Sequence, residues 1–326
     1  MHVYHSDRFV LPLPTGHRFP MAKYARLREG VAALAAPEVE LREAPLVARA
    51  DLEAVHDPGY VARVFDGTLS PAEQRAIGLP WSPALVARSR RSVGATLAAT
   101  RAALGDGLAV SLAGGTHHAR RDRGAGFCVF NDIAVAAHAV LATGLSKRVL
   151  VVDCDVHQGD GTAEMLAAET RAFTVSVHAA RNYPHAKACS DVDVGLPDGC
   201  AGLAYHALLA VTLAHAFACA RPDLVFYQAG ADVYAGDALG RLALDKAAVR
   251  RRDEQVLDAC VTAGAAVVVL MGGGYAEAVQ DIVDIHLGTV AAAVDSARQR
   301  GAGRAPGPGD GAACRHARAR TAPTDD

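Results

Sequence analysis

The sequence predicts an α/β fold in which one mostly parallel sheet is flanked by helices on both faces. Short runs of β-branched and aliphatic residues alternate with Ala-rich, helix-favouring segments, which is the pattern of a doubly wound parallel sheet. Each strand-like run ends in glycines or polar side chains, as strands do where their carboxyl ends border a ligand site. With 326 residues and 51% hydrophobic content the chain can bury one large core, so we expect a single domain.

Five runs are expected to form strands, in the order in which they occur. They are Leu108–Leu112, Val149–Val152, Phe173–Val177, Leu224–Tyr227 and Ala266–Met271. The Ala-rich segments between them predict helices at Ile133–Leu141, Tyr205–Ala220 and Asp245–Ala263. Crossovers that join parallel strands through such helices should be right-handed.

The composition changes near Ser296 to Arg, Gly, Ala and Pro, without apolar periodicity. Such a segment cannot bury enough apolar surface to offset the entropy lost on ordering it. We therefore expect a folded domain over residues 1–295 and a disordered low-complexity tail over residues 296–326.

Charge and cysteine content limit the class of protein. The 33 basic and 35 acidic residues nearly cancel, so neither direct nucleic acid binding nor a general affinity for anionic membranes is expected. The seven cysteines are scattered and form no C-x-x-C pair, which favours a reduced cytoplasmic protein. The first residues lack the features of a signal peptide, and we expect no apolar run long enough to span a bilayer.

A cluster of acids and a histidine follows the second expected strand. Asp155 and His157 are two residues apart, so on an extended segment their side chains point the same way and can bind one ion. Asp232, after a later strand, would be the third ligand, and three protein ligands with an open position are typical of a catalytic metal site. This donor set suits Zn²⁺ but also accepts Fe²⁺ or Mn²⁺. Turn capping is the simpler alternative, but so many buried charges are costly without a cation.

Two further elements carry polar side chains to the same edge of the sheet. His117 and His118 follow a glycine pair, and next to a metal they could take a proton from water and return it to a leaving group. Asp153 and Asp160 are the available carboxylates to orient them. Tyr275 follows three glycines and could donate to a developing oxyanion. Taken alone, a histidine pair or a G-G-G-Y turn is more often structural, and the absence of G-K-[ST] or G-x-G-x-x-G leaves nucleotide binding weakly supported.

These motifs together resemble the metal-dependent histone deacetylase superfamily, which has the arginase-like α/β fold. The matching segments are Gly115 to His118, Gly124 to Asp132, Asp153 to Thr162, Ala229 to Asp232 and Gly272 to Tyr275. The resemblance runs from the N-terminus to about residue 295 and implies a catalytic domain with a sheet of about eight strands. The segments Leu11 to Met21 and Arg181 to Pro184 look most like the class IV branch and its bacterial relatives.

The resemblance also implies a role for each matching residue. It makes Asp155, His157 and Asp232 the zinc ligands, and His117 and His118 the catalytic pair, with His118 as the general base. It makes Asp153 and Asp160 their orienting carboxylates and Tyr275 the residue that polarises the carbonyl. Gly126 and Phe127 would line the channel for the acyl-lysine stem. Asp153, Asp155, His157, Ser176 and Val177 match a structural monovalent-cation site, usually potassium, that is made largely of backbone carbonyls.

The implied activity is that of a zinc-dependent amidohydrolase, which removes acetyl or longer acyl groups from lysine side chains of proteins. Deacetylation of small amines such as acetylpolyamines is the alternative, and the apolar Leu239 mildly disfavours it because some polyamine-selective relatives have an acidic residue near this position. A two-manganese ureohydrolase would need carboxylates where this chain has Gly159 and Ala231. An inactive acyl-lysine-binding module would be expected to lose a ligand, the histidine pair or the tyrosine, and this chain keeps them all.

Overall fold

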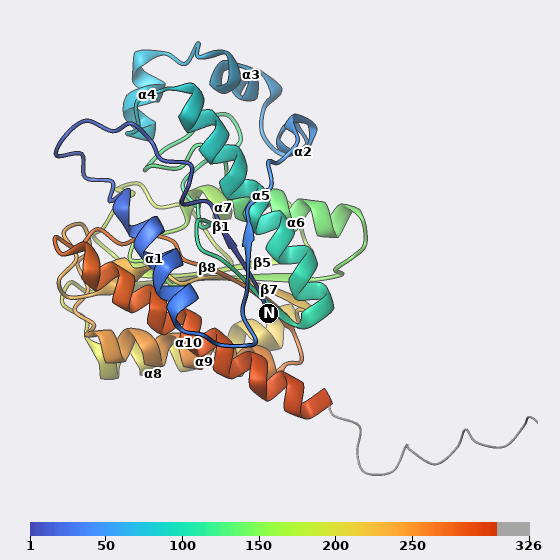
Figure 1. Cartoon of the computed structure of the whole chain (residues 1–326). Coiled ribbons are helices and arrows are strands. Elements are labelled where there is room, and N and C mark those ends of the chain that lie inside the picture. Colours follow the sequence, from blue (N-terminus) through green and yellow to red (C-terminus); the bar gives the residue numbers. More distant parts are fainter. Residues whose placement is uncertain (305–326) are drawn as a thin grey trace, which may run out of the picture.

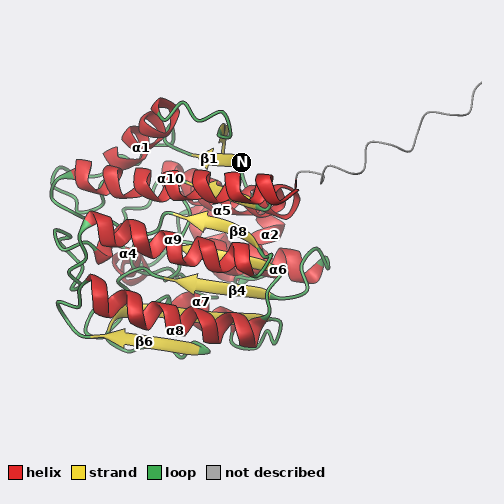
Figure 2. Ribbon diagram, turned by 90° about the horizontal axis from the view of Figure 1, so that it is seen from below, coloured by secondary structure: helices red, strands yellow, loops and turns green. Residues whose placement is uncertain are grey.

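Eight strands form one sheet in the computed structural model, which describes residues 1–304, and every strand pair in it is parallel. The strand order is β2-β1-β3-β8-β7-β4-β5-β6, and the arrows labelled in Figure 2 all point the same way. The strands are β1 (His2–His5), β2 (Glu40–Glu43), β3 (Leu108–Ser111), β4 (Val149–Asp153), β5 (Ala172–Ala179), β6 (Val192–Leu196), β7 (Leu224–Gln228) and β8 (Ala266–Leu270). The predicted fold class is confirmed.

All five predicted strands are present, as β3, β4, β5, β7 and β8. Three further strands, β1, β2 and β6, were not predicted. The two edge strands, β2 and β6, have mostly exposed or half-exposed residues, so they lack the continuous apolar run that marks a strand buried on both faces. The remaining one, β1, has only four residues, two of them histidines.

The helices form two layers, one on each face of the sheet, which Figure 1 shows nearly edge-on. One layer contains α1 (Ala22–Ala33), α8 (Gly202–Ala220), α9 (Lys246–Thr262) and α10 (Val279–Arg304). The other contains α2 (Arg49–Glu53), α3 (Pro58–Asp66), α4 (Pro71–Ile77), α5 (Pro83–Asp106), α6 (Asp132–Ala142) and α7 (Asp160–Leu166). The predicted helices correspond to α6, α8 and α9. Each layer closes its own apolar core against the sheet, which is why both faces of the central strands are buried.

The last helix, α10, ends at Arg304, so the boundary predicted at residue 295 falls inside a helix. Ser296 is buried, Arg298 pairs with Glu38 at 2.8 Å, and Nη1 of Arg300 donates to the carbonyl of Ala265. These contacts with the rest of the fold stabilise the first part of the predicted tail as helix. Residues 305–326 lie outside the described residues, and disorder there stays a prediction.

One helix of the described chain, α8, is long and apolar enough by length and composition to cross a membrane. The expectation that no apolar run has this length is therefore wrong for α8. In the fold the helix lies along the sheet, and its buried side chains, which include Tyr205, Leu209 and Ala216, belong to the apolar core of that layer. The apolar composition of α8 therefore contributes buried side chains to the core of this layer.

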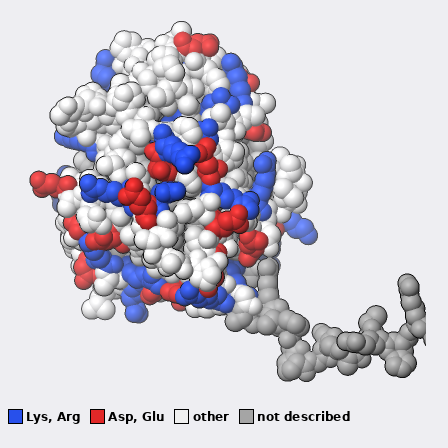
Figure 3. All heavy atoms as spheres, viewed as in Figure 1, with Lys and Arg blue, Asp and Glu red and all other residues white. Residues whose placement is uncertain are grey.

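The surface and the cysteines agree with the composition. Acidic and basic side chains are interspersed on the face drawn in Figure 3, with no large area of one sign. The six cysteines of the described residues are all unpaired, and Cys314 lies outside them.

The strand order brings the chemistry-bearing segments together. Four adjacent strands in the middle of the sheet, β3, β8, β7 and β4, are followed by the His117–His118, Gly272–Tyr275, Asp232 and Asp155–His157 segments. Because parallel strands end at the same edge, these loops border a single site.

A buried histidine ties the two loops that enter this edge from the α2–α6 layer. His56 is fully buried; its Nε2 accepts from the backbone N–H of Asn131 at 3.0 Å, and its Nδ1 donates to the carbonyl of Arg120 at 2.9 Å. This pair of bonds requires the neutral ring. Burial lowers the pKa of His56 to about 4.

We predict that His56 makes the protein less stable as pH falls from about 7 to about 5. The pKa of His56 is lower in the folded protein than its ordinary value of 6.5, so below pH 6.5 the unfolded chain binds a proton at His56 more readily than the folded chain does. The contribution of neutral His56 to the unfolding free energy therefore falls as the pH is lowered towards 4. The loss at pH 5 is about 2 kcal/mol of unfolding free energy. Urea titrations of wild type and His56→Gln at both pH values measure it, and parallel losses in the two proteins would contradict the prediction.

Candidate active site

The three predicted metal ligands meet at the carboxyl edge of the sheet. Asp155 and His157 follow β4, Asp232 lies in the short 3-10 helix η1 (Ala231–Val233) after β7, and one ligand atom from each lies within 4.8 Å of the others. Nδ1 of His157 is 3.1 Å from Oδ1 of Asp155 and 3.3 Å from Oδ2 of Asp232. The N–H of Val156 donates to Oδ1 of Asp232 at 2.9 Å, which fixes the two loops to each other.

The electrostatics of this group fit a bound cation. All three side chains are buried, and Oδ2 of Asp232 accepts no hydrogen bond. Burial and the charge of Asp155 raise the pKa of Asp232 to about 7. A divalent ion would compensate the carboxylates and use the free oxygen as a ligand, and two carboxylates with one imidazole suit Zn²⁺ or Fe²⁺.

Gly273 leaves the space that the ligand oxygens need. A Cβ at this position would lie 1.9 Å from Oδ2 of Asp232 and 2.8 Å from Oδ2 of Asp155. Its N–H donates to the same oxygen of Asp155 at 2.9 Å. The glycine is therefore required by the close approach of the backbone to these carboxylates.

A buried arginine beneath the site holds both ligand loops. Nη1 of Arg252, on α9, donates to the carbonyls of Gly230 at 2.6 Å and Cys154 at 3.2 Å, close in sequence to Asp232 and Asp155. Its charge is paired with Asp253, which also accepts from Tyr227 and Thr289. Sequence reasoning missed this residue, because an arginine inside the charged Arg250–Glu254 segment is typical of a solvated helix face.

His117 and His118 lie beside the ligands, and each is held by its own carboxylate. Nδ1 of His117 is 2.7 Å from Asp153, and Nδ1 of His118 is 2.6 Å from Asp160. The two ring centroids are 4.1 Å apart, and His118 is 5.8 Å from the ring of His157. The sequence had offered Asp153 and Asp160 as the available carboxylates, and in the structure one of them lies against each ring.

The two imidazoles have opposite protonation tendencies. Burial by itself lowers the pKa of His117, but the carboxylates of Asp153 and Asp155 outweigh it and raise the pKa to about 9. Burial and the neighbouring charge of His117 lower the pKa of His118 to about 4, despite its bond to Asp160. A neutral imidazole that can accept a proton therefore lies next to a cationic one.

Two side chains that the sequence analysis did not single out fix the loop that carries the histidines. Asp132 accepts from the N–H groups of Gly115 at 2.8 Å and Thr116 at 2.7 Å. Nε2 of Gln228 donates to the carbonyl of Gly115 at 2.9 Å. The signal for Asp132 was present, because it ends the segment Gly124 to Asp132 that matches the family.

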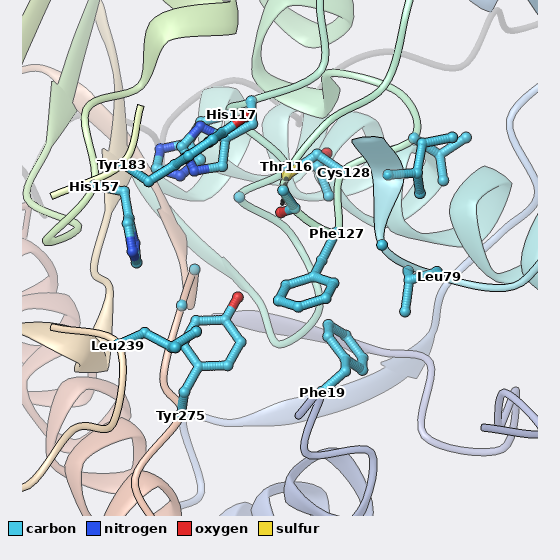
Figure 4. A pocket seen from close by; sticks show the side chains of 18 of the residues that line it. Phe19, Leu79, Thr116, His117, Phe127, Cys128, His157, Tyr183, Leu239 and Tyr275 are labelled. Atoms are coloured by element: carbon cyan, nitrogen blue, oxygen red, sulfur yellow. Dashed lines mark hydrogen bonds between the residues drawn. The ribbon is translucent and has the colours of Figure 1, made fainter. Parts of the chain in front are cut away.

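Tyr275 and Leu239 share one anchor, Asp237, which was also missed. One oxygen of Asp237 accepts from the N–H of Tyr275 at 2.6 Å, and the other accepts from the N–H groups of Leu239 and Gly240. The phenolic oxygen points into the cavity (Figure 4). Burial raises the pKa of Tyr275 well above its ordinary value, so the hydroxyl keeps its proton and can donate it in a hydrogen bond.

A cavity of about 650 Å³ is lined by His117, His118, Asp155, His157 and Tyr275 of the site. Phe127 and Leu239 lie on different sides of it (Figure 4), and Tyr183 packs edge-on against His118 with 4.9 Å between ring centroids. The predicted channel residues Gly126, Phe127 and Leu239 all line it. Its lining also includes buried apolar side chains, among them Leu11, Ile77, Leu79, Leu85, Val129 and Phe130, together with the buried polar side chains of Lys23, Arg88 and Ser92.

Residues 17–290 match the protein family described as the histone deacetylase domain. The chain belongs to this family. Its sheet, its buried Asp-His-Asp group and the order of its motifs are those expected of an amidohydrolase of this type.

Individual relatives agree with this assignment. The chain is 45% identical over 287 residues to an uncharacterized protein of Picosynechococcus, covering 87% of this chain and 95% of the relative. It is 31% identical to a histone deacetylase-like amidohydrolase of Pseudomonas aeruginosa over 82% of this chain and 74% of the relative, and 28% identical to histone deacetylase 2 of Arabidopsis thaliana over 79% and 70%. The crystal structure of the HDA15 HD domain has the same fold, with a TM-score of 0.76 at 21% identity over 90% of this chain and 89% of that chain.

A second metal of the ureohydrolase kind has no ligands at the two required positions in this histone deacetylase domain. A Cβ at Gly159 would lie 2.2 Å from Oδ2 of Asp153, so the fold has no room for a carboxylate side chain there. Ala231 is buried and offers no ligand atom. With Gly159 and Ala231 at these positions, the ligands described above suit one metal ion.

We predict that Gly273→Ala weakens divalent metal binding by about 10- to 100-fold, because the methyl group overlaps Oδ2 of the proposed ligand Asp232. Competition with a chromogenic chelator measures the affinity. Gly105→Ala is the matched control, since nothing lies within 4 Å of a Cβ at that position of α5. Equal zinc affinity in the two variants would show that the close approach at Gly273 is unimportant.

Proposed function

We propose that this protein is a zinc-dependent deacylase that hydrolyses the amide bond between an acyl group and the side chain of lysine. The observation that carries the proposal is the pair His117–His118, each held by its own carboxylate, beside the Asp-His-Asp group in the lining of a cavity. Family membership supports an amidohydrolase, and the channel between Phe127 and Leu239 suits a linear acyl-lysine stem.

The side chains account for each proton in the reaction. A bound Zn²⁺, with Fe²⁺ as the alternative, would supply a Lewis acid that polarises the acyl carbonyl and acidifies a water molecule. Neutral His118 takes a proton as water attacks the carbonyl carbon, and the hydroxyl of Tyr275 donates a hydrogen bond to the carbonyl oxygen as it gains negative charge. The C–N bond then breaks, and the protonated pair returns a proton to the leaving amine. Asp153 and Asp160 keep both rings oriented throughout.

A structural potassium ion is proposed at the backbone of Asp153, Asp155, His157, Ser176 and Val177. Asp153 and Ser176 are register partners in the β4–β5 pair, and all five residues are buried. The carbonyl oxygens at this edge of the sheet would bind a monovalent cation, whose charge would offset their partial negative charges.

The preferred substrate is a protein or peptide acyl-lysine, with acetyl or a longer acyl group. The cavity volume of about 650 Å³ and the apolar side chains in its lining support room for a longer chain. Class IV membership stays a proposal, supported by the Leu11–Met21 and Arg181–Pro184 segments, parts of which line the cavity. Acetylpolyamine remains the alternative substrate class. A cytoplasmic location stays a prediction that rests on the dispersed cysteines.

A rate panel tests substrate and chemistry together. We expect turnover of acetyl-lysine and myristoyl-lysine peptides, with kcat/KM for both above that for acetylspermidine, and inhibition by chelators and hydroxamates. Full activity after metal removal would contradict a metal-dependent reaction. A higher kcat/KM for acetylspermidine than for either peptide would favour the small-amine substrate class over acyl-lysine.

We predict that His118→Ala lowers kcat by about 10²- to 10⁴-fold and Tyr275→Phe by about 10²- to 10³-fold, because each removes a group used only in the transition state. Zinc content and melting temperature should change little, since neither side chain is a proposed ligand. His138→Ala, an exposed position on α6, is the control. Near-normal turnover in either active-site variant would contradict its assigned role.

A further inference from the structure

The outer cavity is lined by arginines from four separate segments of the chain. Arg18 precedes α1, Arg75 lies on α4, Arg181 follows β5 and Arg241 follows η1. All four are exposed, so they border the entrance of the cavity rather than its interior. We call these four residues the arginine rim.

The arginine rim carries more positive charge than its partners neutralise. Arg18 and Arg75 form no ion pair within residues 1–304, while Arg181 and Arg241 share one oxygen of Asp198, at 2.7 and 3.0 Å. Among the described residues that line the cavity, the only carboxylate is Asp155, which belongs to the proposed metal site. Within residues 1–304, Asp198 is therefore the one acidic side chain paired with the arginine rim, and it does not line the cavity.

The arginines lie on both sides of the channel. Arg75 directly precedes Ala76 and Ile77, whose carbonyls accept from the N–H groups of Gly126 at 3.0 Å and Phe127 at 2.7 Å. Their helix is thus attached to the Phe127 side. On the Leu239 side, Nδ2 of Asn182, next to Arg181, donates to the carbonyl of Leu239 at 2.7 Å, and Arg241 follows two residues later.

Acidic residues elsewhere near the entrance are committed to other partners or lie outside the lining. Glu73 pairs with Arg63 at 2.9 Å, and Asp122 pairs with Arg123 at 2.7 Å. Asp237 accepts from three backbone N–H groups. Glu277 is exposed two residues after Tyr275 but does not line the cavity.

We infer that the arginine rim selects acyl-lysine in an acidic sequence context, with Asp or Glu on both sides of the modified lysine. The inference rests on the proposed deacylase function and names its substrate class. Guanidinium groups bind carboxylates in paired hydrogen bonds, and a local positive potential attracts acidic peptides and repels polycations. Lysine-rich segments and polyamines are therefore poor substrates, although the net charge of the whole chain is only −2.

The test uses three peptides with one central acetyl-lysine flanked by glutamates, alanines or lysines. We expect kcat/KM to fall in that order, with at least about a tenfold difference between the extremes at about 20 mM salt and a smaller one at about 300 mM. Binding of the same fluorescent peptides by anisotropy gives a ranking that does not require turnover.

Charge-reversal variants locate the effect. Arg18→Glu and Arg75→Glu leave no ion-pair partner unpaired within residues 1–304. Each should lower the ratio of kcat/KM for the glutamate peptide to that for the alanine peptide by about twofold to fivefold. Arg101→Glu makes the same charge change at an exposed position near the C-terminal end of α5 and should behave as wild type.

Equal rates and equal binding for the three peptides, or a preference that survives both rim reversals, would overturn the inference. Absence of turnover on every peptide, together with tighter binding of the acidic one, would instead count against the proposed function and leave the rim selectivity standing.

Discussion

The burial of three aspartates at one edge of the sheet is the constraint on which the rest of the site depends. Asp153, Asp155 and Asp232 are buried, and uncompensated buried carboxylates are strongly unfavourable. The histidines, the N–H groups that donate to the acids and the proposed cation all offset the negative charge of these carboxylates. The requirement for glycine at position 273 follows from the same crowding.

The parallel sheet makes this concentration of charge possible. Its four central strands end side by side, and the loop after each strand contributes residues to the site. The functional side chains are therefore divided among four loops. The helices then fix those loops from below and from the side. Arg252 connects α9 to both ligand loops, and Asp132 at the start of α6 holds the loop of the histidine pair. A packed scaffold of this kind keeps the catalytic groups oriented before substrate binds.

Local patterns in the sequence predicted the parts of the site that lie next to each other along the chain. Asp155 and His157 are two residues apart on one strand end, and the central strands are continuous apolar runs. The edge strands escaped prediction because half-exposed strands have no such run. Arg252 and Asp237 escaped for a different reason. Arg252 binds the carbonyls of Cys154 and Gly230, and Asp237 joins the N–H groups of its neighbours Leu239 and Gly240 to that of the distant Tyr275. These distant partners leave no pattern in the local sequence.

The sequence by itself therefore determined the fold class, the order of the motifs and the residue types available for metal binding and proton transfer, because these depend on periodicity and on side-chain chemistry. Only the tertiary structure decided how those residues differ in charge. His117 and His118 are identical and adjacent in the sequence, yet their pKa values move in opposite directions. Burial lowers both, but the carboxylates of Asp153 and Asp155 outweigh it at His117, whereas burial and the charge of His117 outweigh the bond to Asp160 at His118. The arginine rim is likewise a product of folding, because four segments distant in sequence meet at one entrance.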